Sequence, residues 1–156
     1  MKKYKFILPL IILAFGNMAA KAQANLSEAK KAIAASNAIY FKAFAKGDSS
    51  IFINRYAPDC WIMPPNAQSL CGPDAPLIFF KLAYEKFGLR NGKFITIDVY
   101  GVSKDIVAEI GFWQSFNARN EMFDNGKYLV LWKKTAKGWK MYRDSFSSDN
   151  ADVKPE

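Results

Sequence analysis

The chain has 156 residues and no histidine, with 22 basic and 14 acidic side chains and a formal net charge of +8. The missing histidine excludes Ser-His-Asp and Cys-His catalytic arrangements and removes the commonest metal ligand. Two cysteines alone cannot complete a zinc site, so we expect neither a metal nor any other cofactor. Any acid–base chemistry must then use Asp, Glu, Tyr or Lys.

The N-terminal segment has the three parts of a secretory signal peptide. Basic MKKYK precedes the apolar run FILPLIILAF, and Ala20-Lys21-Ala22 is typical of a cleavage site. The apolar run has about ten residues, half of what a membrane span needs, and no cysteine directly follows it as a lipid anchor. We predict a signal peptide over residues 1–22, cleavage before Gln23, and an exported, periplasmic or secreted protein without a membrane anchor. A retained helical anchor is the alternative.

Removal of residues 1–22 would take away four lysines and no acidic residue, which leaves a net charge of +4. The remaining basic residues are dispersed, apart from the WKKTAKGWK segment, which is typical of a solvated turn between strands. Nucleic-acid binding needs a denser basic stripe, so we predict none. The remaining length fits one domain, predicted over residues 23–148, with a flexible tail over residues 149–156.

The first half of the remaining chain has the pattern of helices. Asn25 and Glu28 resemble a capping box, and apolar residues recur at helical spacing from Leu26 to Phe44 before Gly47 ends the helix. The sequence predicts a short second helix in SSIFINRY, a strand in CWIM and a third helix in GPDAPLIFFKLAYEKF.

After Gly88 the apolar period changes from helical to alternating. This pattern predicts four strands, in KFITIDVYGV, IVAEIGFWQSF, GKYLVLWKKT and GWKMYRDSFSS. The DNG sequence of residues 124–126 and the KG sequence of residues 137–138 are turn signals between them. The order of elements predicts an α+β fold, with helices packed on one face of a curved antiparallel sheet.

The stretch DCWIMPPNAQSLC has a cysteine on each side of an apparent turn. Counting outward from Pro65 and Asn66, Cys60 and Cys71 come level, which would put them within reach of a disulfide. An oxidising compartment permits the bond, which would stabilise the fold by about 3 kcal/mol in the chain-entropy model. We therefore predict a Cys60–Cys71 disulfide, with two free buried thiols as the alternative. A redox-active pair is not expected, because there is no Cys-x-x-Cys motif.

Four motifs together resemble the nuclear transport factor 2-like superfamily, above all its ketosteroid-isomerase-like and SnoaL-like branches. They are the GD between the first two helices, the YAPD before the first strand, the glycine before the third helix, and the GWK near the last strand. The resemblance implies a cone, cystatin-like in fold, in which a curved antiparallel sheet wraps around three N-terminal helices. It also implies a pocket at the wide end and homodimers that pair through the outer sheet face.

The resemblance to ketosteroid isomerases implies roles for particular positions. Those enzymes use a first-helix tyrosine to donate a hydrogen bond to a developing oxyanion, and Tyr40 stands at that position here. Their general base ends the first strand just before a proline, and here that position is Pro64, which cannot accept a proton. A second, protonated acid of those enzymes corresponds roughly to Val130. Because the base is missing, we predict no ketosteroid isomerase activity.

Several other polar residues are candidates for the pocket. Asn37 lies one helical turn before Tyr40, where an amide in an apolar stripe needs a partner or a wet cavity. Asp98 and Glu109 lie in predicted strands and are candidate acids or bases, although such residues also line the outer face of a sheet. An alternative for Tyr40 is a plain core tyrosine on an amphipathic helix.

Arg143 and Asp144 are neighbours in the last predicted strand, so they point to opposite faces of the sheet. Arg143 shares its parity with Trp139 and Met141, which predicts an inward Arg143 if no bulge intervenes. An inward arginine would suit an anionic or carbonyl ligand. A surface ion pair of the two residues is the alternative.

The expected function is an exported domain whose aromatic-lined pocket binds a small, largely apolar ligand, with lyase, isomerase or hydrolase activity left open. The aromatic or soft apolar strand residues expected in its wall are Trp61, Met63, Trp113 and Tyr128. The alternative is a non-catalytic, dimeric interaction module whose own side chains fill the cone.

Overall fold

The computed structural model describes the backbone of residues 8–150 and the side chains from residue 25 onward. Its elements are, in chain order, α1 (Leu8–Lys46), α2 (Ser49–Ile53), β1 (Tyr56–Met63), β2 (Leu70–Cys71), α3 (Ala75–Lys81), the π-helical turn η1 (Leu82–Lys86), β3 (Asn91–Gly101), β4 (Ile106–Phe116), β5 (Met122–Thr135) and β6 (Gly138–Ser148). Most of the predicted signal peptide and tail lies outside the described residues and side chains, so both stay predictions. No helix among the described residues is long and apolar enough to cross a membrane.

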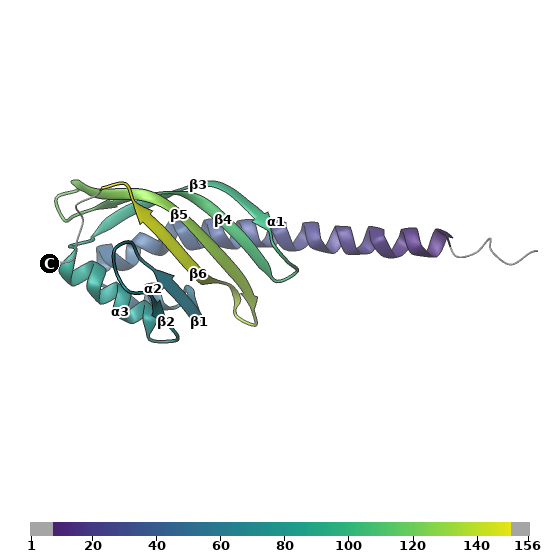
Figure 1. Ribbon diagram of the computed structural model, residues 1–156, viewed down its shortest axis with the longest axis horizontal. Coiled ribbons are helices and arrows are strands. Elements are labelled where there is room, and N and C mark those ends of the chain that lie inside the picture. Colours follow the sequence, from purple (N-terminus) through teal and green to yellow (C-terminus); the bar gives the residue numbers. More distant parts are fainter. Residues whose placement is uncertain (1–7, 151–156) are drawn as a thin grey trace, which may run out of the picture.

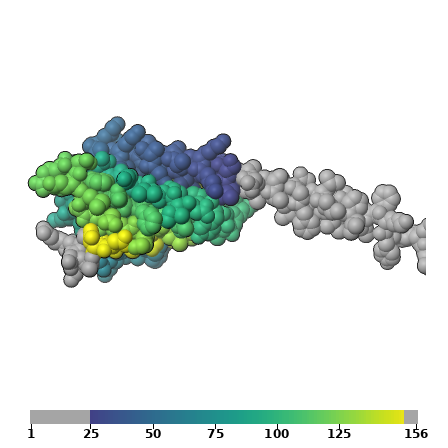
Figure 2. Space-filling model, turned by 90° about the horizontal axis from the view of Figure 1, so that it is seen from above, coloured from purple at the N-terminus to yellow at the C-terminus, as the bar shows by residue number. Residues whose placement is uncertain are grey.

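The strands of the described chain form one six-stranded sheet in the order β2-β1-β6-β5-β4-β3. Neighbouring strands are antiparallel, except that β1 and β6 run parallel. The sheet curves over α1, which contacts both the edge strand β3 and β6, and α2 and α3 lie on the same side (Figure 1). In Figure 2, α1 (dark blue) borders the continuous surface of the strands (teal to yellow). The predicted α+β fold is confirmed.

The predicted apolar stripe of the first helix is its buried face. The buried residues along this face are Ala29, Ile33, Tyr40, Phe41, Ala43 and Phe44. Phe44 stacks on Phe80 of α3, with 4.9 Å between the ring centroids, so one aromatic contact joins the two helices. At the end of α1, Asp48 accepts a hydrogen bond from the backbone N–H of Ser50 at 3.0 Å and caps α2.

The DNG sequence does not form the predicted turn, because residues 124–126 lie inside β5. The chain reverses earlier, where Asn117 Oδ1 accepts hydrogen bonds from the backbone N–H groups of Arg119 and Glu121. A Cβ atom on Gly126 would lie only 1.8 Å from the carbonyl oxygen of Ser147 in β6. This glycine therefore permits a close approach of two strands instead of a turn.

A β-bulge at Tyr142 reverses the alternation of side chains along β6. Met141 and Arg143 pair with adjacent residues of β5, so Tyr142 has no partner in the ladder. Met141 and Asp144 consequently both face the helices, with 2% and 5% of their surface exposed. Arg143 points to the opposite side, where its guanidinium lies over the Tyr142 ring at 3.5 Å. The prediction of an inward Arg143 is therefore wrong.

The predicted disulfide is absent from the structure, in which Cys60 is buried, Cys71 is exposed, and both thiols are free. Cys71 pairs with Trp61 across β1 and β2, one residue away from the predicted level. Because neighbouring strand residues point to opposite faces, this register puts the two sulfur atoms on different sides of the sheet. Cys60 Sγ donates to the carbonyl oxygen of Gly72 at 3.5 Å.

The two thiols should differ strongly in reactivity. Burial raises the pKa of the Cys60 thiol to about 11, so its reactive thiolate is scarce at neutral pH. We expect an alkylating reagent to label Cys71 rapidly in the unreduced native protein and Cys60 only after unfolding, with mass spectrometry locating each label. A Cys71→Ser variant provides the control, because its native form should stay unlabelled. Protection of both cysteines until a reductant is added would contradict the free thiols.

Candidate functional site

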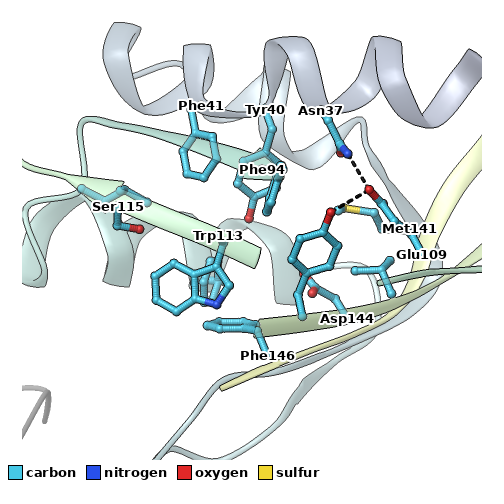
Figure 3. A pocket seen from close by; sticks show the side chains of 14 residues that line it. Asn37, Tyr40, Phe41, Phe94, Glu109, Trp113, Ser115, Met141, Asp144 and Phe146 are labelled. Carbon is cyan, nitrogen blue, oxygen red and sulfur yellow. Dashed lines mark hydrogen bonds between the residues drawn. The ribbon is translucent and has the colours of Figure 1, made fainter. Parts of the chain in front are cut away.

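The concave side of the sheet encloses two adjoining cavities. The inner cavity, with α1 on one side, has a volume of about 530 Å³ including its open mouth. The outer cavity, of about 650 Å³ on the same measure, lies toward α3 and η1. Their shared walls include Phe79, Trp113, Ser115 and Phe146. Figure 3 shows the inner cavity, with Asn37, Tyr40 and Phe41 projecting from the helix toward the sheet.

Glu109 of β4 is a carboxylate held by four hydrogen-bond donors, although only 1% of its surface is exposed. Its Oε1 accepts from Asn37 Nδ2 at 2.7 Å, and from the hydroxyls of Thr96 and Tyr128 at 2.8 Å each. Its Oε2 accepts from Trp132 Nε1 at 3.0 Å. These donors satisfy most of what a carboxylate can accept, so Glu109 ties α1 to three strands as a structural anchor of the cavity.

Asp144 of β6 is less well satisfied. Its Oδ2 accepts a hydrogen bond from the Tyr56 hydroxyl at 2.7 Å, which is the one such contact it makes among the described residues. Burial, with a smaller contribution from the charge of Glu109, raises the pKa of Asp144 to about 6, although the Tyr56 hydrogen bond opposes this rise. Asp144 therefore exchanges its proton close to neutral pH.

Tyr40 lies beside this carboxyl group. Burial raises the pKa of Tyr40 far above its ordinary range, and the charge of Asp144 is the second largest cause of this rise. The same two causes raise the pKa of Tyr56. Both phenols therefore keep their protons and can act as hydrogen-bond donors at any physiological pH. Figure 3 shows the Tyr40 ring reaching from α1 toward the sheet, and its centroid lies 4.8 Å from that of Phe94.

The outer cavity is mainly apolar and includes the Pro-Pro pair of the DCWIMPPNAQSLC stretch. Pro64 and Pro65 line it opposite the side chains of α3 and η1. Asp124, which is 5% exposed, and Ser115 are its polar groups. The resemblance to ketosteroid isomerases placed their general base at the position of Pro64. In the structure Pro64 is part of the cavity wall, where its side chain can neither accept nor donate a proton.

The structure brings together six of the sequence-derived candidates and leaves four outside. The residues in the wall of the inner cavity are Asn37, Tyr40, Glu109, Trp113, Tyr128 and Asp144. The candidates outside both cavities are Trp61, Met63, Asp98 and Arg143. A second bulge, at Ile97 of β3, exposes Asp98, which accepts a hydrogen bond from the next backbone N–H. Trp61 lies on the outer face and is 43% exposed.

Sequence reasoning named Asn37 and Tyr128 but missed the other partners of the two carboxyl groups. Tyr56 is the tyrosine of the YAPD motif. Trp132 shares one face of β5 with Val130 and Tyr128, because the three lie at every second position of the strand. Ser115 and Asp124 gave no signal, because one is a lone serine and the other was assigned to a turn. In the part of the chain that the structure describes, no group of three or more Cys, Asp or Glu residues could hold a metal ion.

No protein-family model and no curated protein matches the chain. Solved structures do match it. A nuclear transport factor 2-like protein of unknown function from Shewanella oneidensis MR-1 is 18% identical, with a TM-score of 0.63 over 76% of this chain and 98% of the other. A ketosteroid isomerase-like protein from Erwinia carotovora atroseptica is 21% identical, with a TM-score of 0.63 over 80% and 96%. LinA is 14% identical, with a TM-score of 0.64 over 85% and 96%.

These similarities define the fold. The chain has the nuclear transport factor 2-like, cystatin-like fold, as the sequence motifs predicted. Proteins of this fold in the comparison include a ketosteroid isomerase-like protein and a protein of unknown function, so the fold by itself does not fix the activity.

The raised pKa of Asp144 should be visible as a pH dependence of stability. Because the folded state binds the proton more tightly than an unfolded aspartate, the free energy of unfolding should fall as the pH rises from about 4 to about 6. Asp144→Asn removes the cost of burying an ionised carboxylate and keeps an acceptor for the Tyr56 hydroxyl. Its stability relative to the wild type, from urea unfolding, should therefore rise between about pH 4 and pH 8, by at most about 3 kcal/mol.

Asp149→Asn is the matched control for that experiment, because Asp149 is an exposed carboxylate of the same terminal region and pairs with Lys127. Its stability relative to the wild type should change little between the same two pH values. An Asp144→Asn variant that follows the pH dependence of the wild type would contradict the raised pKa.

Proposed function

We propose that the cone binds a small, largely apolar molecule and that Asp144 transfers a proton to or from it, as in a lyase or isomerase. The observation that carries this proposal is Asp144 itself, a buried carboxyl group with a pKa of about 6 in an aromatic cavity beside Tyr40. General acid–base catalysis is most effective when the pKa of the group lies near the operating pH.

The walls support an apolar ligand. Phe79, Trp113 and Phe146 line both cavities, and Phe41 and Phe94 close the inner one toward α1. Such rings offer a large apolar area with little loss of side-chain freedom, which favours a flat or compact hydrocarbon body. The walls also hold the few convergent polar groups that small-molecule sites share.

Three side chains have separable roles in the proposed reaction. Asp144 accepts a proton from a carbon atom of the ligand and returns it to another position, or leaves it on the departing group. Tyr56 holds the reacting carboxyl group through its 2.7 Å hydrogen bond. Tyr40 donates a hydrogen bond to the oxygen on which negative charge develops, and the dry surroundings strengthen that bond.

This proposal differs from ketosteroid isomerase chemistry in the location of the base. Pro64 stands where the first strand of those enzymes carries it, whereas Asp144 lies on the last strand. The similarity to a ketosteroid isomerase-like protein supports a small-molecule enzyme, but not the same substrate. We also propose export, on the pattern of residues 1–22.

A homodimer through the outer sheet face is proposed alongside the ligand site. Ile95 and Phe112 pair directly across β3 and β4 on that face and are 44% and 42% exposed. Leu129 of β5 and Trp61 of β1 add further exposed apolar area. The two open cavities count against the alternative of a purely structural dimer with a self-filled cone.

Deuterium exchange of β-tetralone tests the proposed proton transfer directly. The probe is a neutral, flat ketone whose acidic carbon lies next to the carbonyl group. We expect the protein to accelerate exchange at that carbon in heavy water, followed by NMR, because Asp144 can act as base and Tyr40 can stabilise the enolate. Asp144→Asn should slow the catalysed exchange by about a hundredfold or more, and Tyr40→Phe by about tenfold or more.

Tyr100→Phe is the matched control, because Tyr100 is an exposed strand tyrosine outside both cavities. It should exchange β-tetralone at the wild-type rate. Binding of β-tetralone without accelerated exchange would remove the catalytic part of the proposal. A wild-type rate in Asp144→Asn would remove Asp144 as the base.

A further inference from the structure

The outer cavity has a polar corner that the proposed proton transfer does not use. Asp124 of β5 and Ser115 of β4 are direct cross-strand partners, and both line this cavity. They are 5% and 6% exposed. Ser115 also lines the inner cavity, so the corner lies beside the passage between the two.

Asp124 is held through one oxygen atom. Its Oδ1 accepts hydrogen bonds from Ser148 Oγ at 2.6 Å, from the backbone N–H of Asn125 at 2.8 Å and from Asn150 Nδ2 at 3.2 Å. Within residues 25–150, neither Asp124 Oδ2 nor the Ser115 hydroxyl takes part in a hydrogen bond. Because both residues line the cavity and neither atom is among the fully buried polar atoms without a partner, these two groups are accessible to a donor on a ligand.

The charged side chains in the walls of the two cavities are all acidic. Among the described residues, neither cavity has a lysine or an arginine in its wall, whereas three carboxyl groups line them: Glu109, Asp124 and Asp144. Arg55 is buried close to Tyr40 and Tyr56 but belongs to neither cavity wall. Two other cations have partners of their own. Lys127 pairs with Asp149, and Arg90 lies over the Tyr84 ring and donates to backbone carbonyls. A low-dielectric cavity of this kind attracts a cation and disfavours an anion.

We infer that the ligand of the cone is an amphipathic organic amine, whose protonated amino group binds Asp124 and Ser115 while its apolar body lies along Trp113 and Phe146. This inference rests on the proposed function, since it names the chemical class of the molecule bound in the same cone. It reverses the expectation from an inward Arg143, which would have favoured an anionic or carbonyl end.

The geometry lets one molecule use both cavities. Trp113 and Phe146, with 5.8 Å between their ring centroids in an edge-to-face arrangement, belong to the walls of both. Aromatic faces favour a positively charged group near them, which adds to the attraction of Asp124. An amine anchored at Asp124 would direct the rest of its body inward, toward Asp144 and Tyr40.

Three probes with one apolar body test this inference: phenylbutylamine, phenylbutanol and phenylbutyrate. They differ in the charge of the polar end, and calorimetric titration at neutral pH gives their affinities for the full chain. We expect the amine to bind about tenfold tighter than the alcohol, and the carboxylate to bind most weakly. Asp124→Asn, which keeps the shape and the Oδ1 contacts, should lower the amine affinity to that of the alcohol.

Asp149→Asn is the matched control, because it removes an equal charge from the exposed rim and should leave the amine affinity within about twofold. Ser115→Ala is a second variant, should Asp124→Asn fail to fold, and it should weaken the amine about threefold or more. Equal binding of alcohol and amine would overturn the inference while the proposed apolar site stands. A preference for the amine that survives in both Asp124→Asn and Ser115→Ala would also overturn the inference. If none of the three probes binds, the proposed ligand site and the inference are both overturned.

Discussion

The single extra residue at Tyr142 decides which of two oppositely charged neighbours, Arg143 or Asp144, faces the inside of the cone. Without that bulge, strand alternation would turn Arg143 toward the helices and Asp144 toward solvent. With it, Asp144 enters the cavity, and the Arg143 guanidinium stacks on the outer face and donates to the carbonyl of Asp59 at 3.0 Å. The proposed base, its hydrogen bond with Tyr56 and the absence of Arg143 from the described cavity walls all follow from this local irregularity.

Two carboxyl groups in one cavity behave differently because their donors differ. Glu109 receives four hydrogen bonds, so its burial is compensated and it serves to join α1 to the sheet. Asp144 receives one, so burial raises its pKa into the range in which a proton is gained and lost at neutral pH. One acid therefore holds the cavity in shape, and the other is available for proton transfer. The unfavourable burial of Asp144 is typical of a functional position.

The sequence predicted most elements because periodicity is a local property, although α1 begins at Leu8 and not at the predicted capping box of Asn25 and Glu28. The apolar stripe up to Phe44 and the end of the first helix before Gly47 reappear in the structure, and the candidates Asn37, Tyr40 and Glu109 line the inner cavity. Strand registers are not local. The bulge, the one-residue offset of Cys60 and Cys71, and the place of Asp124 inside β5 depend on pairing with distant strands, which no motif of the sequence encodes.

The account depends most on Asp144 being a buried acid that titrates near neutral pH. Carbon-13 NMR of aspartate-labelled protein, with Asp144→Asn to assign the resonance, measures that titration directly. The structure predicts a midpoint at about pH 6 for this carboxyl group, well above that of an exposed aspartate. A midpoint near the ordinary value of about 4 would show that Asp144 is solvated or paired with a cation, and would contradict its role as the base.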